Sequence, residues 1–264
     1  MKGGASMQTI TITNQKGGVG KTTTAFILCC GLIKRGYKVL SIDADPQTNL
    51  SYTAGFMEDN EEYNLYRLFK NKELSSLQVI QKTDLKFDLI PGSLNLAGAD
   101  LEFNQTGREY ILKKIIEPLK NNYDFCVIDT PPTLGILTIN ALTASDSIII
   151  PMKADIYSIQ GFSQLLGMVK NVKEYTNQNL KVDGLLINQY SNRAVLNRNF
   201  NNSIEDVAKQ LNIDVYKSKI RDSVIVREMA FTTKNIFDEQ SKSNIADDYN
   251  GFINEFLEKR GFNK

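Results

Sequence analysis

The segment QKGGVGKTTT at residues 15–24 decides the fold that we expect for this chain. It follows an alternating, strand-like run at residues 8–13 and precedes an apolar, helix-like run at residues 25–34. A strand, a glycine-rich turn and a helix in this order form a loop that binds the phosphates of a nucleotide. The glycines of this segment allow backbone angles that are closed to other residues, so successive amides can curl around phosphate oxygens.

Two side chains near the end of this segment have the chemistry that a nucleoside triphosphate and its metal require. Lys21 is placed to reach the β- and γ-phosphates, and the hydroxyl of Thr22 is placed to ligate Mg²⁺. The helix that begins near Lys21 adds its N-terminal dipole. We therefore predict an ATP site whose loop residues are Lys16, Gly17, Gly18, Val19, Gly20, Lys21, Thr22 and Thr23.

Two later strand-like runs end in aspartate and would complete the site. The run YKVLSI leads into Asp43 and Asp45, and the run FCVI leads into Asp129. Apolar residues followed by aspartate form a Walker B pattern, in which the carboxylate holds Mg²⁺, usually through water. Strands also end in aspartate for solubility or helix capping, so either run alone is a weak signal. The loop and both acidic strand ends, in this order, indicate a magnesium site made by Thr22, Asp43 and Asp129.

The rest of the chain alternates short apolar strands with helical stretches, which is typical of an α/β fold. Continuous Val, Ile and Leu runs of this kind belong to parallel strands buried on both faces. We expect a mostly parallel, twisted sheet flanked by helices on both faces, as in P-loop NTPases, with the ligand at the carboxyl ends of the strands. The expected strands cover residues 37–42, 87–90, 125–128, 147–150 and 182–187, and the expected helices cover residues 108–119, 138–144, 159–175 and 195–211. Residues 7–264 would form one domain, and residues 1–6 a disordered N-terminal extension, native or added.

The composition excludes several classes of protein. The 264 residues carry a net charge of +1 and no histidine, which excludes histidine-based catalysis and histidine metal sites. Cys29, Cys30 and Cys126 are spaced neither as a disulfide framework nor as a metal site. No run approaches 18 apolar residues, so we expect a cytoplasmic protein without a transmembrane span.

The loop and its flanking motifs resemble those of a known family. KGGVGKTT at residues 16–23 resembles the signature of the deviant Walker A ATPases, which include ParA partition proteins, MinD and nitrogenase iron protein. This resemblance implies a homodimer that sandwiches ATP, with Lys16 touching the nucleotide of the partner; on its own, Lys16 could be a solvated loop lysine. DADPQ at residues 43–47 is similar to switch I of ParA proteins, and DTPP at residues 129–132 to switch II. The switch I similarity implies that Asp45 orients the attacking water, whereas a lone Asp45 could cap the following helix.

Catalysis would then rest on Lys16, Lys21 and Asp45. Phosphoryl transfer asks a protein mainly to position water and to neutralise charge. Since few strong bases are available, we expect slow intrinsic hydrolysis of ATP to ADP and phosphate. A regulatory scaffold that binds nucleotide without turnover remains a separate hypothesis.

Further motifs separate the members of this family. LIPGS at residues 89–93 is similar to the ParA segment after the third strand, and the resemblance covers nearly all of the chain from Met7 onward. The cysteine positions do not suit the iron–sulfur cluster of nitrogenase iron protein, and the acidic polar face at residues 247–260 does not suit the membrane helix of MinD-type proteins. Asn188 ends a strand where related ATPases contact adenine, or else it opens a turn. The chain most resembles the short (Soj-like) ParA partition ATPases, with a MinD-like membrane-cycling or other cargo-positioning ATPase as the alternative.

Residues 188–229 contain more basic than acidic side chains, which suits contact with DNA phosphates without sequence preference. By position, Arg193 and Arg221 resemble two arginines that ParA proteins use on DNA. On charge alone, a solvated basic face explains the same residues. In short ParA proteins a separate ParB-like centromere-binding partner stimulates hydrolysis, and few residues precede the nucleotide loop here. We therefore expect such a partner, nonspecific DNA binding, and association with the nucleoid in the ATP state.

Overall fold

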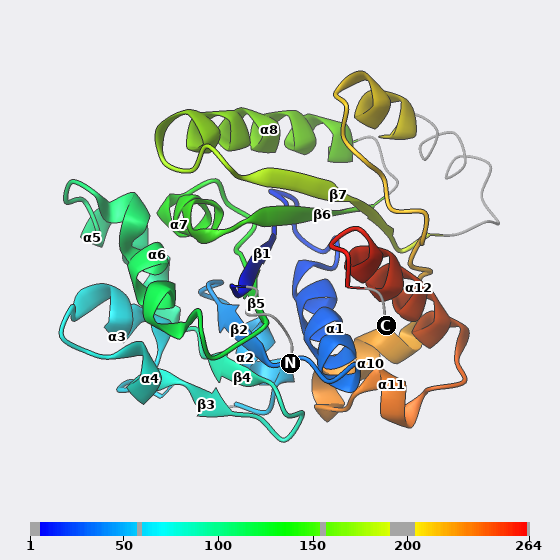
Figure 1. Ribbon diagram of the computed structural model, residues 1–264, viewed down its shortest axis with the longest axis horizontal. Coiled ribbons are helices and arrows are strands. Elements are labelled where there is room, and N and C mark those ends of the chain that lie inside the picture. The colour runs from blue at the N-terminus through cyan, green and yellow to red at the C-terminus, as the bar shows by residue number, and fades with distance from the viewer. Residues whose placement is uncertain (1–5, 57–59, 154–156, 191–203, 263–264) are drawn as a thin grey trace.

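The computed structural model describes residues 6–56, 60–153, 157–190 and 204–262, which are built around a seven-stranded sheet (Figure 1). The strands lie in the order β3-β4-β2-β5-β1-β6-β7, and all neighbours are parallel except β3 and β4. They are β1 (Gln8–Ile12), β2 (Val39–Asp43), β3 (Gln81–Lys82), β4 (Asp88–Ile90), β5 (Phe125–Asp129), β6 (Ser147–Lys153) and β7 (Lys181–Asn188). This arrangement confirms the mostly parallel α/β sheet that the sequence predicts.

The inner strands are buried on both faces because their sequences are almost continuously apolar. β2 and β5, with the sequences VLSID and FCVID, are buried at every position. Each predicted strand is present, with bounds that differ by a few residues at most. The short edge strand β3, which pairs antiparallel to β4, was not predicted, because a two-residue polar strand has no periodicity to recognise.

Helices cover both faces of the sheet. Helices α1, α11 and α12 share one apolar cluster on one face, and α3, α6, α7 and α8 cover the other. The helices are α1 (Lys21–Lys34), α2 (Asn49–Thr53), α3 (Leu65–Lys70), α4 (Ser76–Val79), α5 (Ala99–Glu102), α6 (Ile111–Ile116), α7 (Ile136–Ala144), α8 (Tyr157–Tyr175), α10 (Val224–Thr232), α11 (Ile236–Glu239) and α12 (Asn244–Glu258). Residues 204–210 are also helical.

One predicted helix is broken in the structure. The helix expected at residues 108–119 is broken into α6 and two flanking 3₁₀ turns, Arg108–Tyr110 and Glu117–Leu119. Pro118 explains the second break, since it lacks a backbone N–H and cannot continue the α-helical hydrogen bonding. The first half of the helix expected at residues 195–211 lies outside the described residues, as do residues 1–5 of the predicted N-terminal extension.

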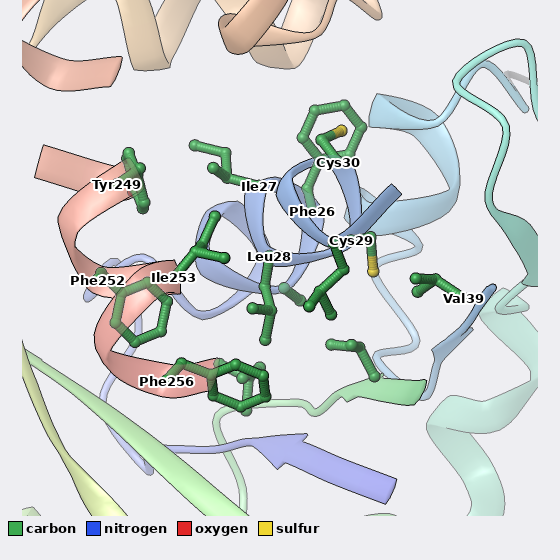
Figure 2. Close-up of a cluster of buried hydrophobic side chains, with 14 of the residues drawn as sticks. Phe26, Ile27, Leu28, Cys29, Cys30, Val39, Tyr249, Phe252, Ile253 and Phe256 are labelled. Carbon is green, nitrogen blue, oxygen red and sulfur yellow. The ribbon is translucent and has the colours of Figure 1, made fainter. Parts of the chain in front are cut away.

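Helix α1, which follows the nucleotide loop, packs beside α12 on the same face of the sheet (Figure 2). An added Cβ on Gly31 would lie 2.1 Å from Cδ1 of Ile253, so only glycine lets the two helices approach this closely. Tyr249, Phe252 and Phe256 of α12 are buried in the same cluster. The apolar stripe of the C-terminal segment therefore docks on the core, as its acidic polar face indicated. Within the described ranges, none of the helices combines the length and the apolar character needed to cross a membrane.

Candidate functional site

The loop between β1 and α1 has the backbone shape of a phosphate cradle. Gly18 and Gly20 have φ angles of +71° and +87°, in the left-handed region that favours glycine. An added Cβ on Gly20 would lie 2.7 Å from Nδ2 of Asn188, so a side chain there would be strained and would also clash. Around Gly17 and Gly18, by contrast, an added Cβ would meet no heavy atom within 4 Å. The outer half of the loop is therefore accessible, while its inner half is packed against β7.

Hydrogen bonds to neighbouring elements fix the start of the loop. Nδ2 of Asn14 donates to the carbonyl of Pro151 in β6 (2.7 Å), and its Oδ1 accepts from the amide of Lys16 (3.0 Å). The ammonium of Lys21 reaches back across the loop to the carbonyl of Lys16 (3.1 Å). Burial lowers the pKa of Lys21, and the negative charge of Asp129 opposes this shift. The loop thus closes around a buried lysine at the first turn of α1.

The end of β7 holds two consecutive loop carbonyls. Nδ2 of Asn188 donates to the carbonyl of Val19 (2.9 Å), and Nε2 of Gln189 donates to the carbonyl of Gly18 (2.8 Å). Because the C=O and N–H of a trans peptide point in opposite directions, the amides of Val19 and Gly20 face away from β7. Asn188 is buried, and its Oδ1 has no hydrogen-bond partner. The structure thus places Asn188 against the nucleotide loop, and its predicted contact with adenine stays a prediction.

Asp129 brings an unsatisfied carboxylate to the same edge of the sheet. It ends β5, is fully buried, and neither carboxylate oxygen accepts a hydrogen bond of ordinary geometry. Burial raises its pKa well above the usual range, the charge of Asp43 raises it further, and nearby Thr22 and Lys21 oppose the shift. A buried carboxylate with so few donors is costly, and a bound cation would satisfy it.

Asp43 lies opposite Asp129 because the two residues are register partners in the parallel pair β2–β5. Its Oδ2 accepts hydrogen bonds from the amide and the hydroxyl of Ser51 (2.8 and 2.6 Å), and its Oδ1 accepts one from the amide of Asp45 (3.2 Å). Burial raises the pKa of Asp43 to about 6, and the hydrogen bonds from Ser51 partly counter this. The Ser51 hydroxyl also accepts from the amide of Gly92 (2.9 Å), which fastens the segment after β4 to the site.

These residues fit a magnesium ion that is shared with phosphate, rather than one held by protein groups alone. Within the described residues, no group of three or more His, Cys, Asp or Glu side chains could hold a metal ion. Two carboxylates, Asp43 and Asp129, and one hydroxyl, Thr22, leave the remaining positions for water and phosphate oxygens, as Mg²⁺ prefers. The set predicted from the sequence is thus chemically adequate, and metal binding by it stays a prediction.

Asp45 lies in the turn that leads from β2 to α2. It is buried, and its Oδ1 accepts a hydrogen bond from the amide of Gln47 (3.0 Å). The residue that caps α2 is Thr48, which has a φ of +54°, so Asp45 closes the turn rather than the helix. Its predicted part in orienting water is compatible with this position and remains untested.

The chain matches known proteins over most of its length. A family model described as an AAA domain matches residues 7–182. The sporulation initiation inhibitor protein Soj of Bacillus subtilis is 41% identical over 83% of this chain and 86% of its own length. The chain belongs to the ParA/Soj family of partition ATPases. It therefore shares the deviant Walker A loop described above.

Solved structures of similar proteins agree with this placement. A cobyrinic acid a,c-diamide synthase from Mycobacterium smegmatis with bound ADP and magnesium has a TM-score of 0.84 and 29% identity, over 97% of this chain and 96% of that one. A putative plasmid partition protein from Borrelia burgdorferi bound to AMPPNP has a TM-score of 0.78 and 27% identity, over 97% of this chain and all of that one. Both similarities cover the whole ParA/Soj fold and include proteins with bound nucleotide.

Of the two arginines that the ParA resemblance assigns to DNA, the structure describes only Arg221. Arg193 lies outside the described residues. Arg221 is partly exposed, but its guanidinium is paired with Asp248 of α12, with Nε–Oδ2 and Nη2–Oδ1 distances of 2.7 and 2.8 Å. A phosphate would therefore meet an arginine that already has an acidic partner.

Sequence reasoning missed two residues that shape the ParA-type site. Ser51, which holds Asp43, lies eight residues downstream in α2, and a small hydroxyl residue there is not a recognisable motif. Gln189, which holds Gly18, follows the predicted Asn188, and its φ of +53° turns its side chain back to the loop. Only the position of Gln189 directly after a strand of the sheet could have pointed to it.

Proposed function

We propose that this member of the ParA/Soj family hydrolyses Mg²⁺-ATP to ADP and phosphate and couples that cycle to DNA partition. The observation that carries the proposal is the pairing of Asp43 and Asp129, two fully buried carboxylates in register on adjacent strands, beside the buried Lys21. Such a cluster is costly to bury, and a protein keeps it where a bound cation neutralises the carboxylates and phosphates neutralise the lysine. The ADP and AMPPNP bound in the M. smegmatis and B. burgdorferi structures support the same ligand class.

Catalysis would depend on positions rather than on a strong base. Lys21 would neutralise charge on the β- and γ-phosphates, and the amides of Val19 and Gly20 would donate to phosphate oxygens. Magnesium, held by Thr22 and the two aspartates, supplies further charge neutralisation. Asp45 would orient the attacking water from the turn after β2.

The ATP state would be a homodimer with a nucleotide in each site, and Lys16 would reach the nucleotide of the partner subunit. Lys16 supports this role by its place in the loop, beside the exposed Gly17 and Gly18. Such a dimer would hold nonspecific DNA through Arg193 and Arg221, and a ParB-like partner would stimulate its hydrolysis. DNA must then bind the ATP dimer better than the other states, since a ligand that binds all states equally does not change the equilibrium between them.

The alternative is another cargo-positioning ATPase, or a MinD-like one that cycles on membranes. The docking of α12 on the core disfavours the membrane version, because the apolar stripe that a membrane would need is already buried. Two further relatives, the chromosome partitioning proteins ParA of Myxococcus xanthus and Caulobacter vibrioides, favour DNA as the surface.

Turnover and dimer formation in an Asp45→Ala variant test the proposal. We expect wild-type protein to hydrolyse ATP slowly and to form dimers with Mg²⁺-ATP by light scattering, and the variant to accumulate the ATP-bound dimer with little turnover. Asp84→Ala, at an exposed turn between β3 and β4, is the matched control and should behave as wild type. Wild-type turnover in Asp45→Ala would remove Asp45 from the mechanism, and absence of both hydrolysis and dimers in wild type would contradict the proposed function.

A further inference from the structure

The basic surface of the C-terminal third carries its own acidic partners. Three of its cations are joined to carboxylates over distances of 2.7 to 2.8 Å. The pairs are Lys219–Glu205, Arg221–Asp248 and Arg227–Asp222. A phosphate that approaches one of these three cations therefore meets a carboxylate that is already bound to it.

The Arg221–Asp248 pair is the most complete of the three. Besides the two guanidinium bonds, Oδ2 of Asp248 accepts a hydrogen bond from the backbone amide of Arg221 (3.1 Å). The side chain of Asp248 is only 14% exposed, whereas that of Arg221 is 46% exposed. The carboxylate is thus held in place beneath an arginine that remains reachable from solvent.

We propose that Asp248 is an internal competitor for the DNA phosphate at Arg221 and so sets the DNA affinity of this protein. The inference rests on the proposed function, because it presumes that Arg221 contacts DNA. Asp248 takes two of the N–H groups of Arg221, so a phosphate would either share the guanidinium with Asp248 or displace it. In both cases a carboxylate would lie near the DNA backbone. The result is a low affinity for DNA and ready dissociation of the complex.

The elements on both sides of this ion pair contact the nucleotide site. On one side, Tyr190 pairs with Arg221 as an isolated parallel bridge, and its amide donates to the carbonyl of Ile220 (2.8 Å). Tyr190 directly follows Gln189, which holds the carbonyl of Gly18. The nucleotide loop and the Arg221 segment are therefore joined through the end of β7.

On the other side, Asp248 directly precedes Tyr249, which is buried against α1 in the central cluster (Figure 2). α1 begins at Lys21, in the nucleotide loop itself. A change of the loop between nucleotide states would act on both ends of the Arg221–Asp248 pair. Bound nucleotide can therefore influence whether Arg221 binds Asp248 or a DNA phosphate.

Neutralising Asp248 should strengthen DNA binding. The guanidinium of Arg221 is about half exposed, so water weakens the pair. Removal of Asp248 as a competitor should therefore raise DNA affinity about threefold per subunit, and about tenfold for a dimer that uses both surfaces. Arg221 would then neutralise one more phosphate, so the slope of log K against log salt should steepen by about one per subunit.

The test measures the affinity of the full chain for a random-sequence DNA duplex, by fluorescence anisotropy with Mg²⁺-ATP over a range of salt. Asp248→Asn is the test variant, with Asp248→Ala as a second variant should the first fold poorly. Asp247→Asn is the matched control, since it removes the same charge from the adjacent, exposed position of α12. Arg221→Glu reports whether the surface binds DNA at all. Thermal unfolding and ATP affinity verify that each variant is folded.

We expect tighter DNA binding and a steeper salt slope for Asp248→Asn and Asp248→Ala, little change for Asp247→Asn, and loss of binding for Arg221→Glu. Unchanged or weaker binding in both Asp248 variants, with Arg221→Glu still inactive, would overturn the competition and make Asp248 a support for Arg221. An equal gain in Asp247→Asn would also overturn it, because net charge alone would then explain the effect. Undiminished binding by Arg221→Glu would instead count against the DNA surface in the proposed function.

Discussion

Replacement of Asp129 by asparagine should stabilise the nucleotide-free protein and abolish its stabilisation by Mg²⁺-ATP. Asp129 is fully buried, and neither of its carboxylate oxygens accepts a hydrogen bond of ordinary geometry. Burial and the charge of Asp43 raise its pKa well above the usual range. Asparagine has nearly the same shape without the charge, so the change removes a desolvation cost and sacrifices no hydrogen bond of ordinary geometry.

The size of this gain depends on pH in a defined direction. In the unfolded chain the carboxyl of Asp129 has a pKa of about 3.9. Because folding raises this pKa, the wild type loses stability relative to the variant as the pH rises from about 4 towards the pKa of the folded protein. At about pH 7.5 the cost of keeping the carboxyl protonated in the fold has a ceiling of about 5 kcal/mol, at about 1.4 kcal/mol per pH unit. Lys21 opposes the shift and loses its counter-charge in the variant. We therefore expect a gain of about 2–4 kcal/mol, or roughly 5–15 °C in melting temperature for a chain of this size.

Thermal unfolding followed by circular dichroism, with and without Mg²⁺-ATP and at several pH values between 5 and 9, measures both effects. Asp84→Asn, at the exposed β3–β4 turn, is the control and should follow the wild type. Without nucleotide, the advantage of Asp129→Asn should grow with pH, and with Mg²⁺-ATP the order should reverse because only the wild type gains binding energy. The reasoning is refuted if Asp129→Asn is less stable than the wild type at every pH without nucleotide, or if Mg²⁺-ATP stabilises both proteins equally.

Two further substitutions test the loop. Lys16→Ala should impair the Mg²⁺-ATP dimer in light scattering while sparing nucleotide binding by the monomer, and undiminished dimer formation would contradict the sandwich. Gln189→Met removes the donor to the carbonyl of Gly18 and should weaken ATP binding about fivefold in calorimetry, the worth of one neutral hydrogen bond. Gln178→Met, at an exposed position before β7, serves as its control, and wild-type affinity in Gln189→Met would show that the loop keeps its shape without this bond.

The sequence predicts where the strand ends and the loop lie, because both follow from local patterns. A strand pattern that ends in aspartate fixes where the carboxylate lies, because parallel strands bring their carboxyl ends to one edge. Asp43 and Asp129 are accordingly register partners. The loop glycines follow from the phosphate-binding pattern, and the positive φ angles of Gly18 and Gly20 agree with it.

The parts that the sequence did not predict depend on contacts between distant residues. Ser51 binds Asp43 only because the turn after β2 folds back over the strand end. The partner of Arg221 is 27 positions away on α12, and no local pattern links the two. The second break in the helix expected at residues 108–119, at Glu117–Leu119, is a local effect of Pro118, which apolar periodicity alone does not reveal.

The central claim is that nucleotide state controls a DNA-binding dimer, and retention on a random-sequence DNA duplex tests it most directly. The measurement compares Mg²⁺-ATP, Mg²⁺-ADP and no nucleotide at two salt concentrations. The account predicts retention with ATP alone, weakened by salt because phosphate contacts dominate. Retention in no state, or equal retention in all three, would contradict it.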